Sequence, residues 1–441
     1  MKFNSTRNSH AYVNFERAVT DCLPADGGLY IPSESTDLRR WILYTDETTP
    51  FASIAGTLTS ACINDEFSPI ICETIATRAF PFEPKLTKLH DRFYTLELFH
   101  TPTGSHRDFG ISYLVNCMET IFQLKGGSAT FLDVSMGELG ASLACALRGK
   151  KHLKAVLIYP KGKPRGLSES DYVWNGGNIY PIEIDGTEED CHRLVREIFA
   201  DRALVERFHL TVANTANIGR LMPQVFFYPY AFSRLKKEVH SDIYYAMAAG
   251  NYSNLVAGLY SWRLSLPLNG FICPTTDELI LDMQGQCAVM DGMVPFKKRE
   301  GADPASPSNL ERLEDVFHNN SLMLKNLVFP MQVTENDIDE ACQKLFMKYH
   351  IFGDRLSSSA YAAARNNRDL TNDDEGVVVL VMRDHPALSA DYIKHTVGEL
   401  PEMPDNIAEA LKPAAIGRPF AAATRETVVA ALESISGWCA P

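Results

Sequence analysis

Three short stretches of the sequence combine glycine with polar residues in patterns that suit the binding of an anion. In the first, "AAGNYSN" (248–254), a glycine and small polar residues follow an apolar run and precede a helix-like one. Such a turn presents free backbone N–H groups at the start of a helix, where they attract phosphate or carboxylate. Alone the pattern is weak, because a strand-to-helix turn that binds nothing has the same form.

The other two stretches carry charged side chains at a similar place. "SMGELG" (135–140) is a second strand-to-helix turn, and Glu138 near the helix start suits the helix dipole without any catalytic role. "HTPTGSHRD" (100–108) brings Arg107 and Asp108 to the start of another helix-like stretch. The plainer interpretation of these two residues is a pair of surface charges.

The elements around these turns follow one repeating order. An apolar run, a polar or glycine-bearing turn and often a helix-like stretch recur at 129–149, 154–163, 178–208, 241–264 and 375–388. Strands that alternate with helices predict an α/β protein with a mostly parallel sheet covered on both faces. In such sheets ligands bind beyond the carboxyl ends of the strands, which is where these turns lie.

Local capping signals support two of the expected helices. Thr187 and Asp190 form a capping-box pattern at the start of the helix expected within 178–208, with Leu194, Ile198 and Leu204 on its buried side. The Pro- and Ser-rich stretch 295–313 predicts a loop, at the end of which Ser308 or Asn309 caps another helix.

Composition excludes several classes of protein. The chain has 441 residues with a formal net charge of -13, so no basic surface for nucleic acid is expected. Its longest purely apolar run, "VVVLVM" (377–382), is too short to span a bilayer. The ten cysteines form no C-x-x-C pair, which is typical of reduced thiols and predicts a cytoplasmic protein without a metal site.

Longer stretches resemble one enzyme family nearly end to end. They are "LELFHTPT" (96–103), "YPKGK" (159–163), "DGTEEDC" (185–191), "ANTANIGRLMPQ" (213–224) and "GNYSNLVAGL" (250–259). Their order and spacing are similar to those of threonine synthase, a pyridoxal-phosphate (PLP) enzyme of fold type II. The resemblance implies two α/β domains of the tryptophan synthase β-like kind behind an N-terminal threonine-synthase-type region.

The same resemblance suggests where the domains begin and end. Residues 1–90 would be the N-terminal region, and 110–235 the smaller domain with the substrate-loop motif. Residues 91–109 together with 236–441 would be the larger domain with the former cofactor site.

The family reaction implied by the resemblance converts O-phosphohomoserine to threonine and phosphate, as a carbon–oxygen lyase. A lysine in an F-K-D segment forms a Schiff base with PLP in that family. Here the segment reads His106-Arg107-Asp108. A guanidinium stays protonated above about pH 12 and offers no free amine, so Arg107 cannot hold PLP covalently.

Other positions that the resemblance assigns to the site also differ from the family. The cofactor positions are Gly250, Asn251, Tyr252, Ser253, Asn254 and Arg383, and the substrate positions are Ser135, Gly137, Glu138, Gly140, Asn217 and Arg220. Ser253 replaces a glycine of the phosphate cup, and Arg383 brings a cation to the pyridine nitrogen. The family's D-P-H-G-A segment reads D-R-L-S-S at 354–358.

Three hypotheses follow. The first is a degenerate pseudoenzyme without aldimine catalysis, in which Arg107 and Arg383 form a pocket for a small anionic metabolite, a phosphate or a carboxylate. Asn217 and Arg220 would extend that site, although Arg220 also suits a helix-surface salt bridge. The second is an active enzyme that uses PLP through another lysine, Lys161 or Lys163. The third is a structural subunit that binds no small molecule; the oligomeric state stays open.

Overall fold

Two separate parallel sheets carry most of the strands in the computed structural model. It describes residues 2–63, 65–289, 294–295, 298–317, 321–368 and 376–438. The larger sheet has the order β14-β11-β10-β15-β5-β4, and only β4 at its edge is antiparallel to its neighbour. Its strands are β14 (Val328–Met331), β11 (Gly270–Pro274), β10 (Ile243–Ala246), β15 (Val377–Met382), β5 (Phe93–Glu97) and β4 (Lys85–His90).

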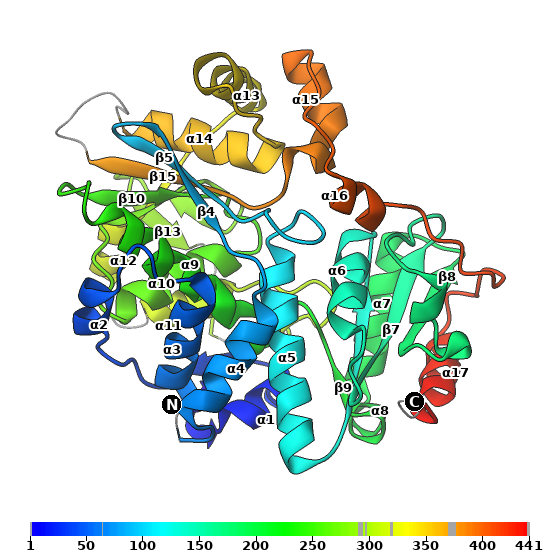
Figure 1. Cartoon of the computed structure of the whole chain (residues 1–441). Helices are drawn as coiled ribbons and strands as arrows, with labels where there is room; N and C mark the ends of the chain where they lie inside the picture. The colour runs from blue at the N-terminus through cyan, green and yellow to red at the C-terminus, as the bar shows by residue number, and fades with distance from the viewer. Residues whose placement is uncertain are drawn as a thin grey trace.

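The smaller sheet is entirely parallel. Its order is β8-β7-β6-β9, formed by β8 (Ile179–Ile184), β7 (Leu153–Pro160), β6 (Ala129–Val134) and β9 (Leu210–Thr211). The helices of this part are α6 (Glu138–Leu147), α7 (Glu188–Ala200) and α8 (Arg202–Phe208), and Figure 1 shows them beside the sheet on the right. Strands were expected in each of the five repeating segments, and the structure confirms one in every segment.

The helix expected after β8 is confirmed at its start and wrong in its length. Thr187 and Asp190 form the full capping box of α7. The chain then breaks at Asp201, whose carboxylate accepts from the backbone N–H groups of Ala203 and Leu204 and so starts a second helix, α8. Leu204 therefore belongs to α8, where it is only half-buried.

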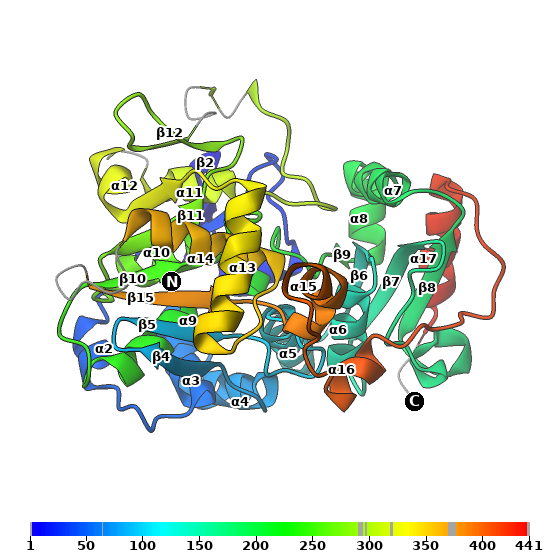
Figure 2. The same ribbon diagram turned by 90° about the horizontal axis from the view of Figure 1, so that it is seen from above.

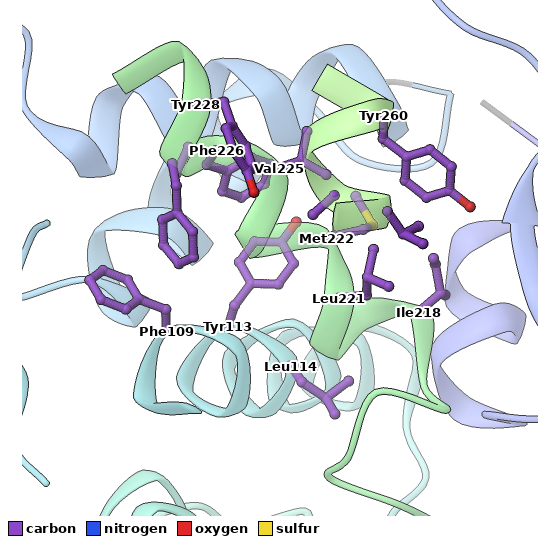
Figure 3. Packing of buried hydrophobic residues seen from close by; sticks show 14 of the residues in the cluster. Phe109, Tyr113, Leu114, Ile218, Leu221, Met222, Val225, Phe226, Tyr228 and Tyr260 are labelled. Carbon is purple, nitrogen blue, oxygen red and sulfur yellow. The ribbon is translucent and has the colours of Figure 1, made fainter. Parts of the chain in front are cut away.

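Three helices pack against one another beside the larger sheet: α5 (Arg107–Lys125), α9 (Ile218–Leu235) and α10 (Ser253–Arg263). Helix α5 also contacts α6 and β7 of the smaller sheet. Figure 3 shows aromatic and aliphatic side chains of α5 and α9 facing each other, with Tyr260 of α10 at the edge of the group. The N-terminal region packs on the same core through Phe51, whose ring lies 5.3 Å from that of Phe109 and 5.9 Å from that of Phe227.

The N-terminal region combines a small antiparallel sheet with four helices. The sheet has the order β2-β1-β3, from β1 (Phe3–Ser5), β2 (Asn8–Val13) and β3 (Tyr30–Pro32). The helices are α1 (Phe15–Thr20), α2 (Arg39–Tyr44), α3 (Phe51–Ile63) and α4 (Pro69–Ala79).

The remaining elements surround the larger sheet or return to the smaller one. They are β12 (Leu279–Leu281), β13 (Cys287–Val289), α11 (Leu310–Val316), α12 (Ser321–Leu327), α13 (Glu335–Tyr349), α14 (Arg355–Asn367), α15 (Ala390–Val397), α16 (Asp405–Ala410) and α17 (Arg425–Ser436). Asn309 is the N-cap residue of α11, as expected for that position, but its side chain makes no capping hydrogen bond.

The last part of the chain crosses to the smaller sheet, as Figure 2 shows from above. Val428, Leu432 and Ile435 of α17 lie in one apolar cluster with residues of β7, β8 and α7. This helix therefore packs away from the larger sheet, although the predicted larger domain included all of 236–441. The domain limits themselves stay a prediction.

Two further observations concern the whole chain. No helix among the described residues is long and apolar enough to cross a bilayer. All nine described cysteines are free thiols, and the cytoplasmic location stays a prediction.

Candidate functional site

Arg107 is the first residue of α5 and is held by an ion pair rather than left free. Its Nη1 donates to Ser105 Oγ at 3.0 Å and lies 3.4 Å from Asp384 Oδ1, at the end of β15. Asp384 also accepts from Ser105 Oγ at 2.6 Å and from His106 Nδ1 at 3.3 Å. Although burial favours the neutral form of Asp384, the charge of Arg107 and the bond from His106 hold its pKa well below the usual range.

The two neighbours of Arg107 are His106 and Asp108, and both are buried beside the loop that precedes α5. Burial lowers the pKa of His106 to about 4, so its imidazole is neutral at pH 7. Asp108 is buried and accepts from the backbone N–H of Thr103 at 2.8 Å and from the Thr103 hydroxyl at 3.0 Å. The interpretation of Asp108 as a surface charge is therefore wrong, because its carboxylate fixes the turn behind it.

Arg383 connects the end of β15 with the turn that precedes α10. Its backbone carbonyl accepts from the N–H of His106 at 2.8 Å. Its guanidinium lies over Gly250, whose φ is 52°, and Nη1 is 3.0 Å from the place that a Cβ of this glycine would take. The Nε atom is buried without a hydrogen-bond partner. Burial lowers the pKa of Arg383, while Asp384 and Asp354 raise it.

Two residues of the predicted phosphate cup are engaged in the framework instead. Asn251 Nδ2 donates to Thr215 Oγ1 at 2.9 Å and to the carbonyl of Pro307 at 3.2 Å. Tyr252 is the N-cap of α10 with a φ of 66°, and its hydroxyl is hydrogen-bonded to that of Thr276 at 2.6 Å. Both side chains therefore hold the turn in shape and are not available to a ligand in this arrangement.

The next two residues, Ser253 and Asn254, are buried. Ser253 is buried as the first residue of α10. Asn254 is 1% exposed, and neither its amide nitrogen nor its amide oxygen has a hydrogen-bond partner. Because native proteins pair nearly all buried polar groups, an amide with both atoms unpaired indicates a place where a ligand completes the bonding.

A second unpaired group lies on α9. Arg220 is only 4% exposed, and its Nη1 has no hydrogen-bond partner. Burial, together with the charge of Arg107, lowers the pKa of Arg220 to about 9. Gly110 of α5 makes room for this guanidinium, because a Cβ there would lie 1.8 Å from Nη1. The interpretation of Arg220 as a helix-surface partner is wrong.

Gln224 is a site residue that sequence reasoning missed. It follows Arg220 by one helical turn, is fully buried, and has no partner for either amide atom. The signal that could have found it is its spacing, because residues four apart on a helix share a face. Tyr228 lies one turn further along α9, and its hydroxyl donates to the carbonyl of Asn254 at 2.7 Å. Burial raises the pKa of Tyr228, while the charge of Arg383 lowers it.

Asn217 lies near this face of α9 but serves as a helix cap. Its Oδ1 accepts from the N–H of Gly219 at 2.9 Å. Its Nδ2 donates to the carbonyl of Val19 at 2.8 Å and to Thr211 Oγ1 at 3.2 Å. All the hydrogen-bonding groups of this fully buried side chain are thus in use, and the structure does not bring it to a ligand.

The predicted substrate turn follows β6 of the smaller sheet, and its backbone donors are hydrogen-bonded within the turn itself. Ser135 Oγ accepts from the N–H groups of Gly137 at 3.0 Å and Gly140 at 2.8 Å, so these donors are already used. Glu138 is the first residue of α6 and is half-buried. Gly137 has a φ of 129° and faces the side chain of Arg165.

Three arginines lie close to one another where α5, α9 and β15 meet. The charges of Arg107, Arg220 and Arg383 are close enough to act on the same groups, since Arg107 lowers the pKa of both other arginines. Of the nearby acids, Asp384 stays ionised, whereas burial raises the pKa of Asp133 to about 7. Burial also raises the pKa of Asp108 and Asp354. Burial therefore disfavours the charged form of these three acids, whereas the guanidinium groups attract an anion.

Comparisons with known proteins identify the family. A family model described as the threonine synthase N terminus matches residues 2–80. The threonine synthase of Buchnera aphidicola (subsp. Acyrthosiphon pisum) is 32% identical over 348 residues, which cover 78% of this chain and 81% of that protein. The chain belongs to the threonine synthase family. The threonine synthase of Escherichia coli is 29% identical over 414 residues, which cover 93% of this chain and 94% of that enzyme.

Solved threonine synthases have the same fold. A PLP-bound threonine synthase from Brucella melitensis superposes with a TM-score of 0.82 at 22% identity, over 99% of this chain and 100% of that one. The Escherichia coli threonine synthase superposes with a TM-score of 0.78 at 24% identity, over 98% and 100%. The predicted α/β architecture of fold type II with its N-terminal region is confirmed.

The position that the resemblance assigns to the Schiff-base lysine carries the guanidinium of Arg107, which is paired with Asp384, and Arg383 lies over Gly250. A guanidinium at that position does not fit a tethered PLP, because it offers no free amine. Lys161, one of the two lysines considered as another source of the amine, is exposed, and its ammonium group lies 4.4 Å from the centre of the Phe420 ring. We therefore derive no chemical step through PLP.

Proposed function

We propose that this chain is a threonine synthase homologue without Schiff-base catalysis, which binds a small anionic metabolite through Arg107, Arg220, Arg383 and the start of α10. The observation that carries the proposal is Arg107, the first residue of α5, whose guanidinium is paired with Asp384. A guanidinium cannot lose its proton near neutral pH, so it can neither attack an aldehyde nor carry a proton between substrate atoms.

The unpaired groups support an oxygen-rich anion as the ligand. Arg220 Nη1 and Asn254 Nδ2 are buried donors without acceptors, and Arg383 Nε is a third. An unpaired buried donor costs about 1 to 3 kcal/mol, and more when it is charged. A carboxylate or phosphate that accepts from these groups would remove that cost, and arginine forks match the geometry of both anions.

The catalytic half of the proposal is tested with PLP itself. The purified protein is mixed with PLP, followed for visible aldimine absorbance, reduced with borohydride and mapped for labelled lysines. We expect no stoichiometric labelling of a single lysine and no turnover of O-phosphohomoserine. One labelled lysine together with turnover would establish the alternative, an active enzyme that uses another amine.

Two variants show whether the arginines are the cause. Arg107→Lys alone should form little or no aldimine, because Arg383 still lies over Gly250. The double variant Arg107→Lys/Arg383→Thr should form more, since it restores the amine and also replaces the cation over Gly250 with a smaller neutral side chain. Full recovery in the single variant would mean that Arg383 does not obstruct the cofactor.

The binding half is tested by calorimetry with two simple anions, inorganic phosphate and malonate. We expect at least one of them to bind and Arg383→Gln to weaken it by about tenfold, the loss of one charge-assisted hydrogen bond. Arg40→Gln on the exposed face of α2 is the matched control and should bind as the parent protein does. Equal affinities of all three proteins would exclude an anion site at Arg383.

A further inference from the structure

Two buried amide side chains beside the proposed anion site have unpaired oxygens as well as unpaired nitrogens. Gln224 of α9 is 0% exposed and Asn254 of α10 is 1% exposed, and neither has a hydrogen-bond partner for either amide atom. An ionised carboxylate only accepts hydrogen bonds, so it can pair with the two amide nitrogens but not with Gln224 Oε1 or Asn254 Oδ1. An anion without a donor of its own therefore leaves two buried acceptors unpaired, which is costly.

Helix α9 places Gln224 between the cation and the start of α10. Arg220, Gln224 and Tyr228 are spaced four residues apart, so their side chains share one face of the helix. Gln224 is about 6 Å along the helix axis from each of the other two. The Tyr228 hydroxyl donates to the backbone carbonyl of Asn254 at 2.7 Å, which holds the first turn of α10 against this face. A ligand of only a few atoms bound to Arg220 therefore reaches the amide of Gln224.

The missing donor is better supplied by a neutral group than by an ammonium group. A buried ammonium needs a carboxylate beside it, because an unpaired charge is expensive to bury. The acids that act on Arg220 and Arg383 already accept hydrogen bonds from the protein; they are Asp108, Asp133, Asp354 and Asp384. The charges of three arginines in the same place oppose a further cation. A hydroxyl group carries no charge, donates one hydrogen bond and accepts others, so it matches an amide that offers both atoms.

We propose that the ligand of this site is a small hydroxy acid and that Gln224 distinguishes it from other acids. The acidic group binds the arginines, and the hydroxyl group, a few atoms away, donates to an amide oxygen and accepts from an amide nitrogen of Gln224 or Asn254. The inference rests on the proposed function, because the arginines must hold the acidic group. A site with buried polar groups rejects an analogue that cannot pair with them more strongly than an apolar pocket does.

Three acids with the same four-carbon chain test the proposal in calorimetry at pH 7 with the full chain. Malate carries a hydroxyl group, succinate carries hydrogen in its place, and aspartate carries an ammonium group. We expect malate, in one of its two enantiomers, to bind about tenfold more tightly than succinate, the effect of one hydrogen bond to a buried acceptor. Aspartate should bind no more tightly than succinate.

The other outcomes each have one meaning. Equal affinities for malate and succinate would overturn the proposal and leave the anion site intact. Tightest binding of aspartate would show that the amide oxygens receive an ammonium group, and the proposal would be wrong as well. Phosphate or malonate binding that depends on Arg383, without binding of malate, would refute the hydroxy acid alone. If none of these anions binds, the proposed function fails and this inference fails with it.

A variant of Gln224 tests its role apart from the shape of the site. Gln224→Met keeps a similar volume and should weaken malate binding about tenfold, to the affinity of succinate, while succinate binds as before. The melting temperature should not fall, because the change removes a buried amide without partners. Gln123→Met, at an exposed position of α5, is the matched control and should change the binding of neither acid. Equal weakening of malate and succinate by Gln224→Met would mean that Gln224 shapes the site and does not select the ligand.

Discussion

Two buried arginines in two regions of the molecule differ in how their donors are used. Arg312, in α11, is 0% exposed and donates to the carbonyls of Tyr30, Thr215 and Ala216 at 3.0, 2.5 and 3.0 Å. Arg220, in α9, is 4% exposed and keeps Nη1 without a partner. Burial lowers the pKa of both, to about 10 for Arg312 and to about 9 for Arg220.

This difference separates framework from site. Arg312 takes acceptors from the N-terminal region and from the segment before α9, so it joins three parts of the chain that are far apart in sequence. Arg220 keeps one buried donor nitrogen without an acceptor, which destabilises the fold. A buried charge that the protein leaves unpaired is better explained by a ligand than by packing. Burial alone does not make the distinction, because both side chains are almost fully enclosed.

The largest effect is expected when the framework arginine is removed. Arg312→Met should lower the free energy of unfolding by about 4 to 5 kcal/mol, because several buried carbonyls lose their donor at once. Urea unfolding at pH 7 measures the loss, and Arg40→Gln provides the baseline of an exposed arginine. A loss below about 1 kcal/mol would mean that Arg312 does not stabilise the fold more than an exposed arginine does.

Asp133, an acid near Arg220, should make the unfolding free energy depend on pH. Burial raises the pKa of Asp133 to about 7, so between the unfolded pKa near 4 and pH 7 the folded protein holds a proton that the unfolded chain lacks. Stability from this group is therefore present at low pH and is lost as pH rises through that window. Asp133→Asn should gain about 3 to 4 kcal/mol relative to the parent protein between pH 4 and pH 8.

Urea unfolding across that pH range measures the effect. Because Asp133 also accepts from the N–H of Ala213 at 2.7 Å, the variant has a constant cost that does not depend on pH, and only the slope is decisive. Parallel stability curves for the two proteins would mean that Asp133 titrates at an ordinary pKa.

A smaller effect is expected from filling the space that Arg220 uses. In Gly110→Ala, the new Cβ would lie 1.8 Å from Arg220 Nη1 and 2.6 Å from its backbone oxygen, so α5 and α9 must move apart. We expect a loss of about 2 kcal/mol in unfolding free energy and weaker anion binding. Gly437→Ala is the control, since nothing lies within 4 Å of a Cβ there. A stable Gly110→Ala protein with unchanged phosphate affinity would contradict the close contact.

The smallest effect on stability is expected from Arg220 itself. Arg220→Met removes an unpaired buried charge and should leave the unfolding free energy within about 1 kcal/mol of the parent protein, or raise it. Phosphate or malonate binding should fall by about tenfold in calorimetry. A large loss of stability with no change in anion binding would mean that Arg220 stabilises the fold, as Arg312 does, and does not bind a ligand.

Local sequence patterns predicted the elements well and their ends less well. The capping box at Thr187 was found from two residues three apart, because both partners lie in one helical turn. Asp201 was missed as a break, since the apolar spacing continues through it and only the cap geometry divides α7 from α8. Asp190 and Asp201 are both acids at helix starts, and the pattern alone does not distinguish a cap from a continued helix.

The candidate site was predicted by position, and the state of each side chain was not. The resemblance placed Asn217 and Arg220 together, yet one is a helix cap with every group bonded and the other is an unpaired cation. Gln224 was absent from the prediction because its only signal is the spacing of four residues from Arg220 on the same helix, which was not used. Asp108 was interpreted as an exposed charge, because charged residues usually lie at the surface. In the structure its carboxylate accepts a hydrogen bond from the backbone N–H of Thr103.

Sequence by itself determined that position 107 has no amine to lose a proton, because that property belongs to the arginine side chain whatever surrounds it. It also determined the alternating strands and helices, since their periodicity is local. Only the tertiary structure decided that Arg107 is paired with Asp384, which is 277 residues away in the chain, and that Arg220 is left unpaired. The energy of a buried charge depends on which distant groups the fold brings beside it, and no local pattern encodes that.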